Sequence, residues 1–341
     1  MSTAYDQRLR ELAASPKTWL VTGAAGFVGS HLVEALLRCG QRVIGLDNLL
    51  TGQRENLKLV EQAIASPECF ARFRLIEADI CDFDACVEAT RGVDVVLHQA
   101  ALGSVPRSIE QPLETHRNNA DGTVHVFLAA LHNRVPRVVY ASSSSVYGDE
   151  PTLPKTEARI GRPLSPYAVS KRVAEIYAEV YARTHGLWAV GLRYFNVVGS
   201  RQDPNGPYAA VIPRWVTALA RGQRPVLFGD GETTRDFCPV HNVVQANLLA
   251  GTSQAELGGR VYNVALGGRT SLNQLFTMLR DGMAARGFDC AGMQPDYQPF
   301  RPGDIRHSLA DIGAAQRDLG YSPRTSLAEG LQSVMDFFSR A

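Results

Sequence analysis

Residues 19–29 read Trp19-Leu20-Val21-Thr22-Gly23-Ala24-Ala25-Gly26-Phe27-Val28-Gly29, a short β-forming run that passes through three glycines into a helical pattern ending near Cys39. In such a unit Gly23 permits the tight turn, Gly26 lets the backbone approach a pyrophosphate, and Gly29 lets helix and strand pack closely. A second β-rich run ends in Asp47, 18 residues after Gly29, where its carboxylate can accept hydrogen bonds from an adenosine ribose. Because that carboxylate would repel a 2′-phosphate, we predict a dinucleotide-binding turn with NAD, rather than NADP, as the cofactor.

The rest of the first half continues the same alternation of β-rich and helical segments. The expected strands are Trp19–Thr22, Val43–Asp47, Phe73–Glu77, Val93–Gln99, Arg137–Ser142 and Trp188–Tyr194. The expected helices are Gly26–Cys39, Phe83–Thr90, Thr115–His132 and Pro166–His185. This order predicts an α/β fold with a Rossmann-like doubly wound parallel sheet, covered by helices on both faces.

After Tyr194 the pattern is less regular, which indicates a smaller α/β lobe. A loop-like stretch is followed by helical and β-rich segments at Ile212–Arg221, Val226–Phe228, Arg260–Val264, Leu272–Arg286 and Leu327–Ser339. We assign residues 17–195 mainly to an NAD-binding domain and 196–341 mainly to the smaller lobe, with the chain crossing between them. Residues 1–16 are predicted to form a short amphipathic helix or an arm.

Composition and charge exclude several classes of protein. The chain has 341 residues, 45% of them hydrophobic, and its 35 basic and 34 acidic side chains give a net charge of +1, so nucleic acid is not an expected partner. Charged residues occupy the N-terminus where a signal peptide needs an apolar run, and no stretch reaches the ~18 apolar residues of a membrane span. Six cysteines without a Cys-x-x-Cys pair indicate no metal site and no disulfide framework, as in a cytoplasmic enzyme.

Further candidates for cofactor binding lie where later strands end. They are Asp79, Ile80, Gln99, Ala100, Ala101 and Asn119. Asp79 could reach the adenine amino group, and the small residues after the fourth strand would let the cofactor lie against the strand tips. Gln99 and Asn119 are plausible polar supports, although either could be an ordinary loop or cap residue. We interpret the neighbouring His98 as a packed histidine rather than a base.

The segment Ser165-Pro166-Tyr167-Ala168-Val169-Ser170-Lys171 predicts a helix start followed by a reactive pair. Ser165 and Pro166 suit the N-cap and first helical positions, so Tyr167 and Lys171, four apart, share one helical face. A phenol with a pKa of ~10 is a poor base near neutrality, but a nearby ammonium and an oxidised nicotinamide both stabilise the phenolate. The pair could then remove a proton from a sugar hydroxyl while hydride leaves its carbon. Alone, Tyr-x-x-x-Lys would more often be a surface pair.

A hydroxyl cluster ends the fifth strand in Ser142-Ser143-Ser144-Ser145, at the sheet edge where doubly wound folds bind ligands. One of these serines could hydrogen-bond the reacting oxygen and share its proton with Tyr167. A serine run elsewhere would more often be a solvated loop, so the argument depends on its place at a strand end. The serines show no G-x-S-x-G elbow, which argues against serine-hydrolase chemistry.

With these motifs placed, the chain resembles the extended short-chain dehydrogenase/reductase superfamily from about Lys17 to its C-terminus. It is most similar to the UDP-sugar 4-epimerases, particularly the UDP-N-acetylglucosamine 4-epimerases, and its G-x-x-G-x-x-G spacing is this superfamily's form. The resemblance implies that Tyr167 is the base, that Lys171 holds the nicotinamide ribose and tunes Tyr167, and that Ser143 is the hydroxyl partner. Four more residues complete the expected cofactor-binding set: Phe27, Val28, Asn48 and Tyr194.

The resemblance also implies which residues bind a UDP-sugar. Ser143, Ser144 and Ser145, with Gly103 and Ser104, would touch the sugar. The UDP moiety would be held by a second set, in which the two arginines bind the pyrophosphate: Asn196, Ala210, Val211, Arg235, Arg301 and Asp304. Ser308 aligns with a position where a tyrosine is associated with non-acetylated hexoses, so its small side chain leaves room for an acetamido group.

The predicted function is reversible C4 epimerisation of UDP-GlcNAc and UDP-GalNAc, and also of UDP-Glc and UDP-Gal, through a 4-keto intermediate and bound NAD. Related uronic acid substrates remain open for the same reaction.

The chemical alternative is a nucleotide-sugar 4,6-dehydratase or a UDP-glucuronate decarboxylase. Dehydratases of this superfamily carry Asp-Glu where this chain has Ser144 and Ser145, and the decarboxylase pattern expects a Glu in that motif. The other alternative is a non-catalytic NAD-binding sensor, but degenerate members usually lose the Tyr/Lys pair. The resemblance also implies a homodimer formed through the helices expected at Thr115–His132 and Pro166–His185.

Overall fold

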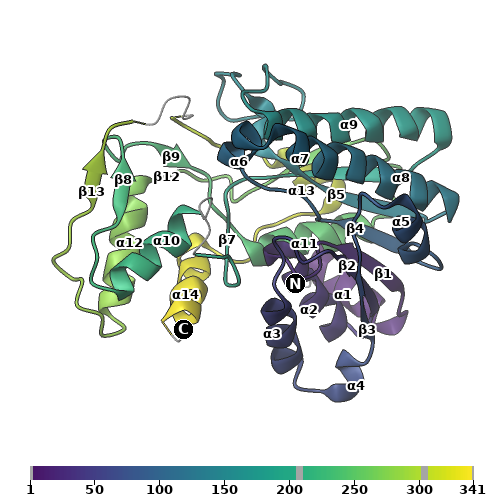
Figure 1. Cartoon of the computed structure of the whole chain (residues 1–341), viewed down its shortest axis with the longest axis horizontal. Coiled ribbons are helices and arrows are strands. Elements are labelled where there is room, and N and C mark those ends of the chain that lie inside the picture. Colours follow the sequence, from purple (N-terminus) through teal and green to yellow (C-terminus); the bar gives the residue numbers. More distant parts are fainter. Residues whose placement is uncertain (1–2, 205–209, 301–305, 340–341) are drawn as a thin grey trace.

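Seven parallel strands form the central sheet of the chain, in a computed structural model that describes residues 3–204, 210–300 and 306–339 (Figure 1). The strand order is β11-β6-β5-β4-β1-β2-β3. In chain order these strands are β1 (Thr18–Thr22), β2 (Arg42–Asp47), β3 (Phe73–Glu77), β4 (Val95–His98), β5 (Arg137–Ser143), β6 (Ala189–Tyr194) and β11 (Val261–Val264). The order reverses between β1 and β4, and ligands of such sheets bind outside the carboxyl ends of the strands at that point. The predicted doubly wound fold is confirmed.

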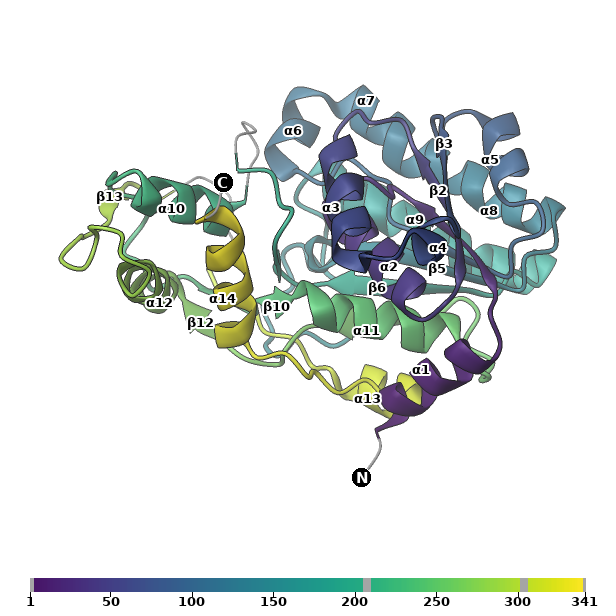
Figure 2. The same ribbon diagram turned by 90° about the horizontal axis from the view of Figure 1, so that it is seen from below.

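Helices cover both faces of this sheet because alternate residues of each buried strand point to opposite sides. Trp19 and Val21 of β1 pack in one apolar cluster, and Leu20 packs in the other. The first cluster joins the sheet to α1 (Ala4–Ala14), α2 (Phe27–Arg38), α3 (Arg54–Ile64), α11 (Val240–Gly251) and α13 (Gly313–Leu319). The second joins it to α5 (Phe83–Ala89), α8 (Gly122–His132) and α9 (Pro166–His185). Figure 2 shows α1 and α13 beside α11, on the outer side of the first layer.

A separate apolar cluster forms the core of the smaller lobe, on the left in Figure 1. It lies between α10 (Val211–Ala220), α12 (Leu272–Ala284) and α14 (Leu327–Phe338). Short paired strands complete this part of the chain: β7 (Val197–Val198) with β10 (Cys238–Pro239), β8 (Val226–Phe228) with β13 (Asp296–Gln298), and β9 (Thr234–Arg235) with β12 (Thr270–Ser271). Between these pieces the chain returns to the large sheet to form α11 and β11.

Several segments differ from the expectations drawn from sequence, among them α3 and α13, which were not expected. The helix expected at Thr115–His132 is divided into α7 (Pro112–His116), the π-helical segment η1 (Arg117–Asp121) and α8, preceded by α6 (Val105–Glu110). The strand counted with the smaller lobe, near Val261, is the edge strand β11 of the large sheet. α11 was not expected at all, because every residue in it except His241 is buried and such a helix shows no amphipathic period. The shorter elements α4 (Pro67–Phe70) and η2 (Ser144–Tyr147) complete the fold.

The N-terminal segment forms helix α1, closed by a capping box between Thr3 and Asp6. Within the described part of the chain, no helix combines the length and apolar character that crossing a membrane requires.

Candidate active site

The glycine turn (residues 23–29) is built from backbone contacts that leave no room for side chains. Gly23 has φ +67°, and a Cβ there would lie 2.9 Å from Cα of Ala100. A Cβ on Gly29 would lie 1.9 Å from the carbonyl oxygen of Gly23. Gly26 is the N-cap of α2, and no side chain of the described residues caps that end. The helix therefore presents free N–H groups at Phe27 and beyond, an arrangement that suits the pyrophosphate of NAD.

Asp47 lies at the end of β2, directly beside the glycine turn. Its carboxylate accepts hydrogen bonds from the backbone N–H of Ala25 and of Leu49, both at 2.8 Å. Burial raises the pKa of Asp47, and these two hydrogen bonds oppose the rise. The carboxylate thus fixes the glycine turn to β2, and its remaining lone pairs lie where a ribose was expected.

The expected adenine-binding residues lie beyond β3. Asp79 accepts hydrogen bonds from the Asn48 side chain at 3.1 Å and from the backbone N–H of Cys81 at 2.8 Å. Next to it is a cavity of about 340 Å³ lined by Leu50, Asp79, Leu113, Glu114, Arg117 and Asn118. Ile80 is buried against α8, since a Cβ on Gly122 would lie 2.6 Å from it. The cavity could offer an adenine ring the Asp79 carboxylate and two apolar side chains, Leu50 and Leu113, and this binding stays a prediction.

The ends of β4 and β6 are joined by three polar side chains. Tyr194 donates to Gln99 Oε1 at 3.0 Å and accepts from Asn247 Nδ2 at 2.8 Å, while Gln99 Nε2 donates to Asn247 Oδ1 at 3.2 Å. Ala100 and Ala101 follow Gln99 directly and leave the strand ends uncovered by large side chains. Asn247 belongs to α11, so it was missed from sequence together with that helix.

His98 is held as a neutral, structural side chain. The Thr22 hydroxyl accepts the backbone N–H groups of Gln99 and Ala100, so its own proton goes to His98 Nδ1 at 2.7 Å. The Thr123 hydroxyl donates to a carbonyl, so His98 Nε2 carries the proton that Thr123 accepts, at 3.0 Å. Burial, together with the charge of Lys171, lowers the pKa of His98 to about 3. The histidine is packed, as the sequence indicated.

Asn119, in the π-helical segment, connects two parts of the site. It accepts from the backbone N–H of Leu102 at 2.7 Å and donates to the Leu102 carbonyl and to the Ser170 hydroxyl. Ser170 lies next to Lys171 on α9, so Asn119 ties the loop after β4 to that helix. Its expected contact with the cofactor stays a prediction.

Tyr167 and Lys171 lie in the first turns of α9, which begins where the sequence predicted. Ser165 is the N-cap and accepts the Ala168 N–H at 3.1 Å. Lys171 is buried and donates to the carbonyl of Ala141, on β5, at 2.9 Å. Burial lowers the pKa of Lys171 to about 8. Burial raises the pKa of Tyr167, and a hydrogen bond with the Ser143 side chain opposes that rise.

The serine turn (Ser143–Ser145) links the end of β5 to η2. Ser143 Oγ accepts the backbone N–H of Ser145 at 3.1 Å, which holds it at the mouth of the turn. Ser145 Oγ is buried and has no hydrogen-bond partner among the described residues, so a ligand could supply one. Tyr167, Lys171 and Ser143 thus lie where the start of α9 meets the end of β5, and Ser144 follows in the same turn. Their expected roles stay a prediction.

The expected sugar-nucleotide residues are on the smaller lobe and on loops facing it. Ser308 donates its backbone N–H to the carbonyl of Thr234 at 3.1 Å, so its segment runs along β9, which carries Arg235. Asp236 is fully buried and accepts backbone N–H groups from Leu266, Gly267 and Ala310, all at 3.1 Å. That carboxylate joins three separate segments and was missed from sequence.

The remaining expected contacts are distributed over several elements. Ser104 is the N-cap of α6, Gly103 lies in open space before it, and Ala210 and Val211 begin α10. Asn196 is exposed after β6, and its carbonyl accepts the Cys238 N–H. Arg301 and Asp304 lie outside the described residues.

Comparison with known proteins identifies the family. The model of the NAD dependent epimerase/dehydratase family matches residues 19–265. A UDP-glucose 4-epimerase of Mycolicibacterium smegmatis is 38% identical over 94% of this chain and 97% of its own length. The solved UDP-N-acetylglucosamine 4-epimerase of Methanobrevibacter ruminantium, in complex with UDP-N-acetylmuramic acid, is 38% identical, with a TM-score of 0.87 over 95% of this chain and 98% of its own.

A dTDP-glucose 4,6-dehydratase of Streptomyces venezuelae, solved with NAD bound, is 32% identical, with a TM-score of 0.83 over 95% of this chain and 97% of its own. The prediction of NAD as the cofactor is thereby confirmed, and the resemblance seen in the sequence is confirmed with it. The chain belongs to the NAD dependent epimerase/dehydratase family.

Proposed function

We propose that this chain catalyses the reversible C4 epimerisation of UDP-N-acetylglucosamine and UDP-N-acetylgalactosamine, and that it also converts UDP-glucose and UDP-galactose. The observation that carries the proposal is the meeting of three side chains at the end of β5. Lys171 is buried against β5, and the Ser143 side chain lowers the pKa of Tyr167, one helical turn before Lys171. The named 4-epimerases among the relatives support the same reaction.

In this reaction Tyr167 takes the proton from O4 of the sugar, and Ser143 hydrogen-bonds the same oxygen. Burial disfavours the phenolate of Tyr167. Tyr167 therefore needs nearby positive charge to act as a base, and we assign that role to Lys171, one helical turn after it. NAD, when bound, supplies a reversible acceptor for the hydride of C4. Once the sugar has presented its other face, C4 takes hydride back and O4 takes its proton back from Tyr167, so the reaction has no net redox change.

The sugar has to turn while the nucleotide stays in place, and we assign that anchoring to Arg235 and Arg301. Ser308 gives room beside C2 for an acetamido group. One steric contact of this kind discriminates by only ~1–3 kcal/mol, so we expect the non-acetylated sugars to be slower substrates rather than excluded ones.

A dehydratase is the second candidate, since a 4,6-dehydratase is among the similar structures. Elimination of water across C5 and C6 needs an acid and a base beside the ring. The serine turn offers Ser144 and Ser145 at the positions where dehydratases carry Asp-Glu. This difference favours epimerisation.

We also propose a homodimer formed through α9 and its neighbours. Val169, Ile176 and Tyr177 lie at helical spacing on α9 and are each more than a third exposed. An apolar face of this kind suits a second copy of the chain. Light scattering of the purified protein should give twice the chain mass, and a monomer would contradict the proposal.

The test of function is incubation of the purified protein with UDP-GlcNAc or UDP-Glc, followed by proton NMR of the anomeric region. UDP-GalNAc formed without added cofactor would support the 4-epimerase and show that NAD stays bound. A 4-keto-6-deoxy product would indicate the dehydratase instead. Binding of NAD and UDP-sugars without any conversion, including that of uronic acid analogues, would indicate a sensor.

A further inference from the structure

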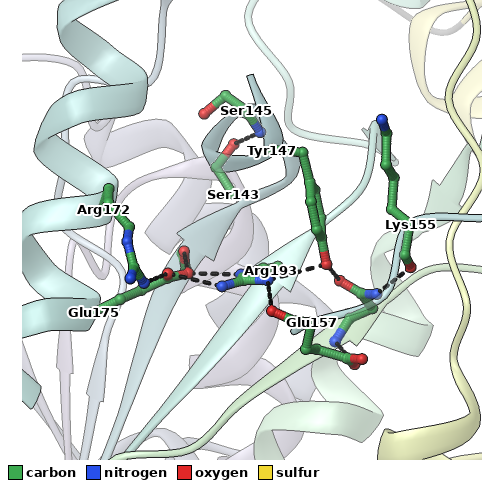
Figure 3. A network of polar contacts seen from close by, with 10 residues as sticks. Ser143, Ser145, Tyr147, Lys155, Glu157, Arg172, Glu175 and Arg193 are labelled. Atoms are coloured by element: carbon green, nitrogen blue, oxygen red, sulfur yellow. Dashed lines mark hydrogen bonds and ion pairs between the residues drawn. The ribbon is translucent and has the colours of Figure 1, made fainter. Parts of the chain in front are cut away.

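A buried ion pair lies behind the serine turn, between α9 and β6 (Figure 3). Glu175 is one helical turn after Lys171, and Arg193 is the residue before Tyr194; both side chains are 1% exposed. Arg193 binds Glu175 through two hydrogen bonds, Nε to Oε1 at 2.8 Å and Nη2 to Oε2 at 2.9 Å. Arg172 adds a third donor to Oε2 at 2.9 Å.

Ser142 connects this ion pair to the end of β5. Its hydroxyl donates to Glu175 Oε1 at 2.6 Å, and the side chain is buried. Ser142 stands between Ala141, whose carbonyl accepts from Lys171, and Ser143, the partner of Tyr167. Two successive residues of β5 are therefore tied to α9, one through Lys171 and the other through Glu175.

Arg193 also makes hydrogen bonds at the end of η2, beyond the serine turn. Arg193 Nη1 donates to the Tyr147 hydroxyl at 3.1 Å and to the carbonyl of Glu157 at 3.0 Å. The Tyr147 hydroxyl donates to Asn263 Oδ1 at 2.6 Å, and Asn263 Nδ2 donates to the carbonyl of Asp311, three residues after Ser308, at 2.9 Å. One hydrogen-bonded network thus connects α9, the two residues that flank the serine turn (Ser142 and Tyr147) and the segment that carries Ser308.

A buried ion pair is a weak source of net stability, because removing two charges from water offsets most of their attraction. Its hydrogen bonds fix distances and angles more narrowly than apolar packing does. Glu175 uses both carboxylate oxygens, and only its bond to Ser142 leads to the strand that carries Ser143.

We propose that Ser142 and Glu175 are positioning residues for the epimerisation, because their hydrogen bond sets the separation between Ser143 on β5 and Tyr167 and Lys171 on α9. The inference rests on the proposed function. Neither side chain touches the substrate in this scheme, so both act through the three reacting residues.

The test is Ser142→Ala, which removes the tether and leaves the ion pair intact. A displacement of the order of 1 Å at reacting groups can cost about a hundredfold in rate, so we expect kcat for UDP-GlcNAc to fall by roughly tenfold to a hundredfold with KM little changed. The rising limb of the pH profile should move to higher pH, because the Ser143 hydrogen bond that lowers the pKa of Tyr167 is weakened. Ser142→Thr, which keeps the hydroxyl, should restore the wild-type kcat and the wild-type pH profile.

The matched control is Ser253→Ala. Ser253 is also buried, and its hydroxyl accepts a hydrogen bond from the N–H of Ala255. Its carbonyl accepts from Arg137, at the opposite end of β5. This variant should lose similar stability and keep the wild-type kcat and pH profile. A Ser142→Ala enzyme that matches wild type or the Ser253→Ala enzyme in both quantities would overturn the inference. A wild-type protein that converts no UDP-sugar would instead refute the proposed function.

Discussion

At Gly29, a Cβ would lie 1.9 Å from a backbone oxygen, whereas at Gly292, in the smaller lobe, no atom lies within 4 Å of the corresponding position. The cofactor half, which holds the glycine turn and the Tyr167–Lys171 pair, is shaped by the close approach of the backbone between its strands and α2. The smaller lobe, where we propose that the sugar nucleotide binds, depends on side chains that connect distant segments, as Asp236 connects residues 266–267 and Ala310. Substitutions at the close-packed glycines of the first half should therefore act on folding and NAD binding, and those in the smaller lobe on its pH response and on substrate selectivity.

The largest expected effect tests this contrast directly. Gly29→Ala should lower the free energy of unfolding by about 3 kcal/mol or more and abolish NAD binding, because neither the turn nor the helix can move away from the added methyl group. Gly292→Ala should stay within about 0.5 kcal/mol of wild type. Urea unfolding of the two variants measures the free energy of unfolding, and the NAD content of the purified proteins measures cofactor binding. Equal effects of the two substitutions would remove the distinction between the two halves.

Within the cofactor half, Tyr167→Phe should lower kcat without lowering the free energy of unfolding. Loss of a general base typically costs about 10²–10⁴ in kcat, while phenylalanine keeps the aromatic ring and removes only the hydroxyl. We expect NAD content and the urea midpoint to stay close to wild type. The control is Tyr181→Phe on the same helix, which should keep full activity. A Tyr167→Phe enzyme with more than a tenth of the wild-type kcat would exclude Tyr167 as the base.

The cofactor half was also the more predictable half, for a physical reason. The glycine turn, the start of α9 and the Tyr167–Lys171 pair are local patterns, in which residues a few positions apart determine both the geometry and the chemistry. The fold class follows from them together with the strand–helix alternation.

What could not be predicted depends on residues distant in sequence. Asn247 binds Gln99 across 148 positions, and Ser142 binds Glu175 across 33. α11 was missed because burial on nearly all sides removes its period, and the π-helical segment before α8 arises from backbone hydrogen bonding that leaves no pattern in the sequence. Asp236 could not be singled out beside Arg235, since its three donors are backbone groups from other segments.

Asp236 predicts a pH response of the smaller lobe. Burial raises its pKa to about 6, from an ordinary value of 3.8, although several backbone N–H groups oppose the rise. The folded chain therefore holds this proton more tightly than the unfolded chain does. The stabilisation is complete below pH ~4 and is lost as the pH rises through about 6, in total about 3 kcal/mol.

The measurement is the free energy of unfolding of wild type and of Asp236→Asn between pH 4 and 7. The free energy of unfolding of wild type minus that of Asp236→Asn should fall steadily from pH 4 to pH 7, because asparagine does not titrate. A difference that is constant with pH would mean that the carboxylate is ionised throughout, and that the backbone donors outweigh burial.

The smallest expected effect concerns Ser308, a single side chain on the segment that β9 and Asp236 hold in place. Ser308→Tyr should reduce kcat/KM for UDP-GlcNAc relative to UDP-Glc by about 1–3 kcal/mol, or roughly 5- to 150-fold, because the ring would occupy the volume of the acetamido group. The unfolding free energy and NAD content should not change, since Ser308 is bound to β9 through its backbone. Ser308→Ala is the control for loss of the hydroxyl and should keep the wild-type preference. If Ser308→Tyr also keeps the wild-type preference for UDP-GlcNAc, substrate selectivity in the smaller lobe is set by several residues rather than by the volume at position 308.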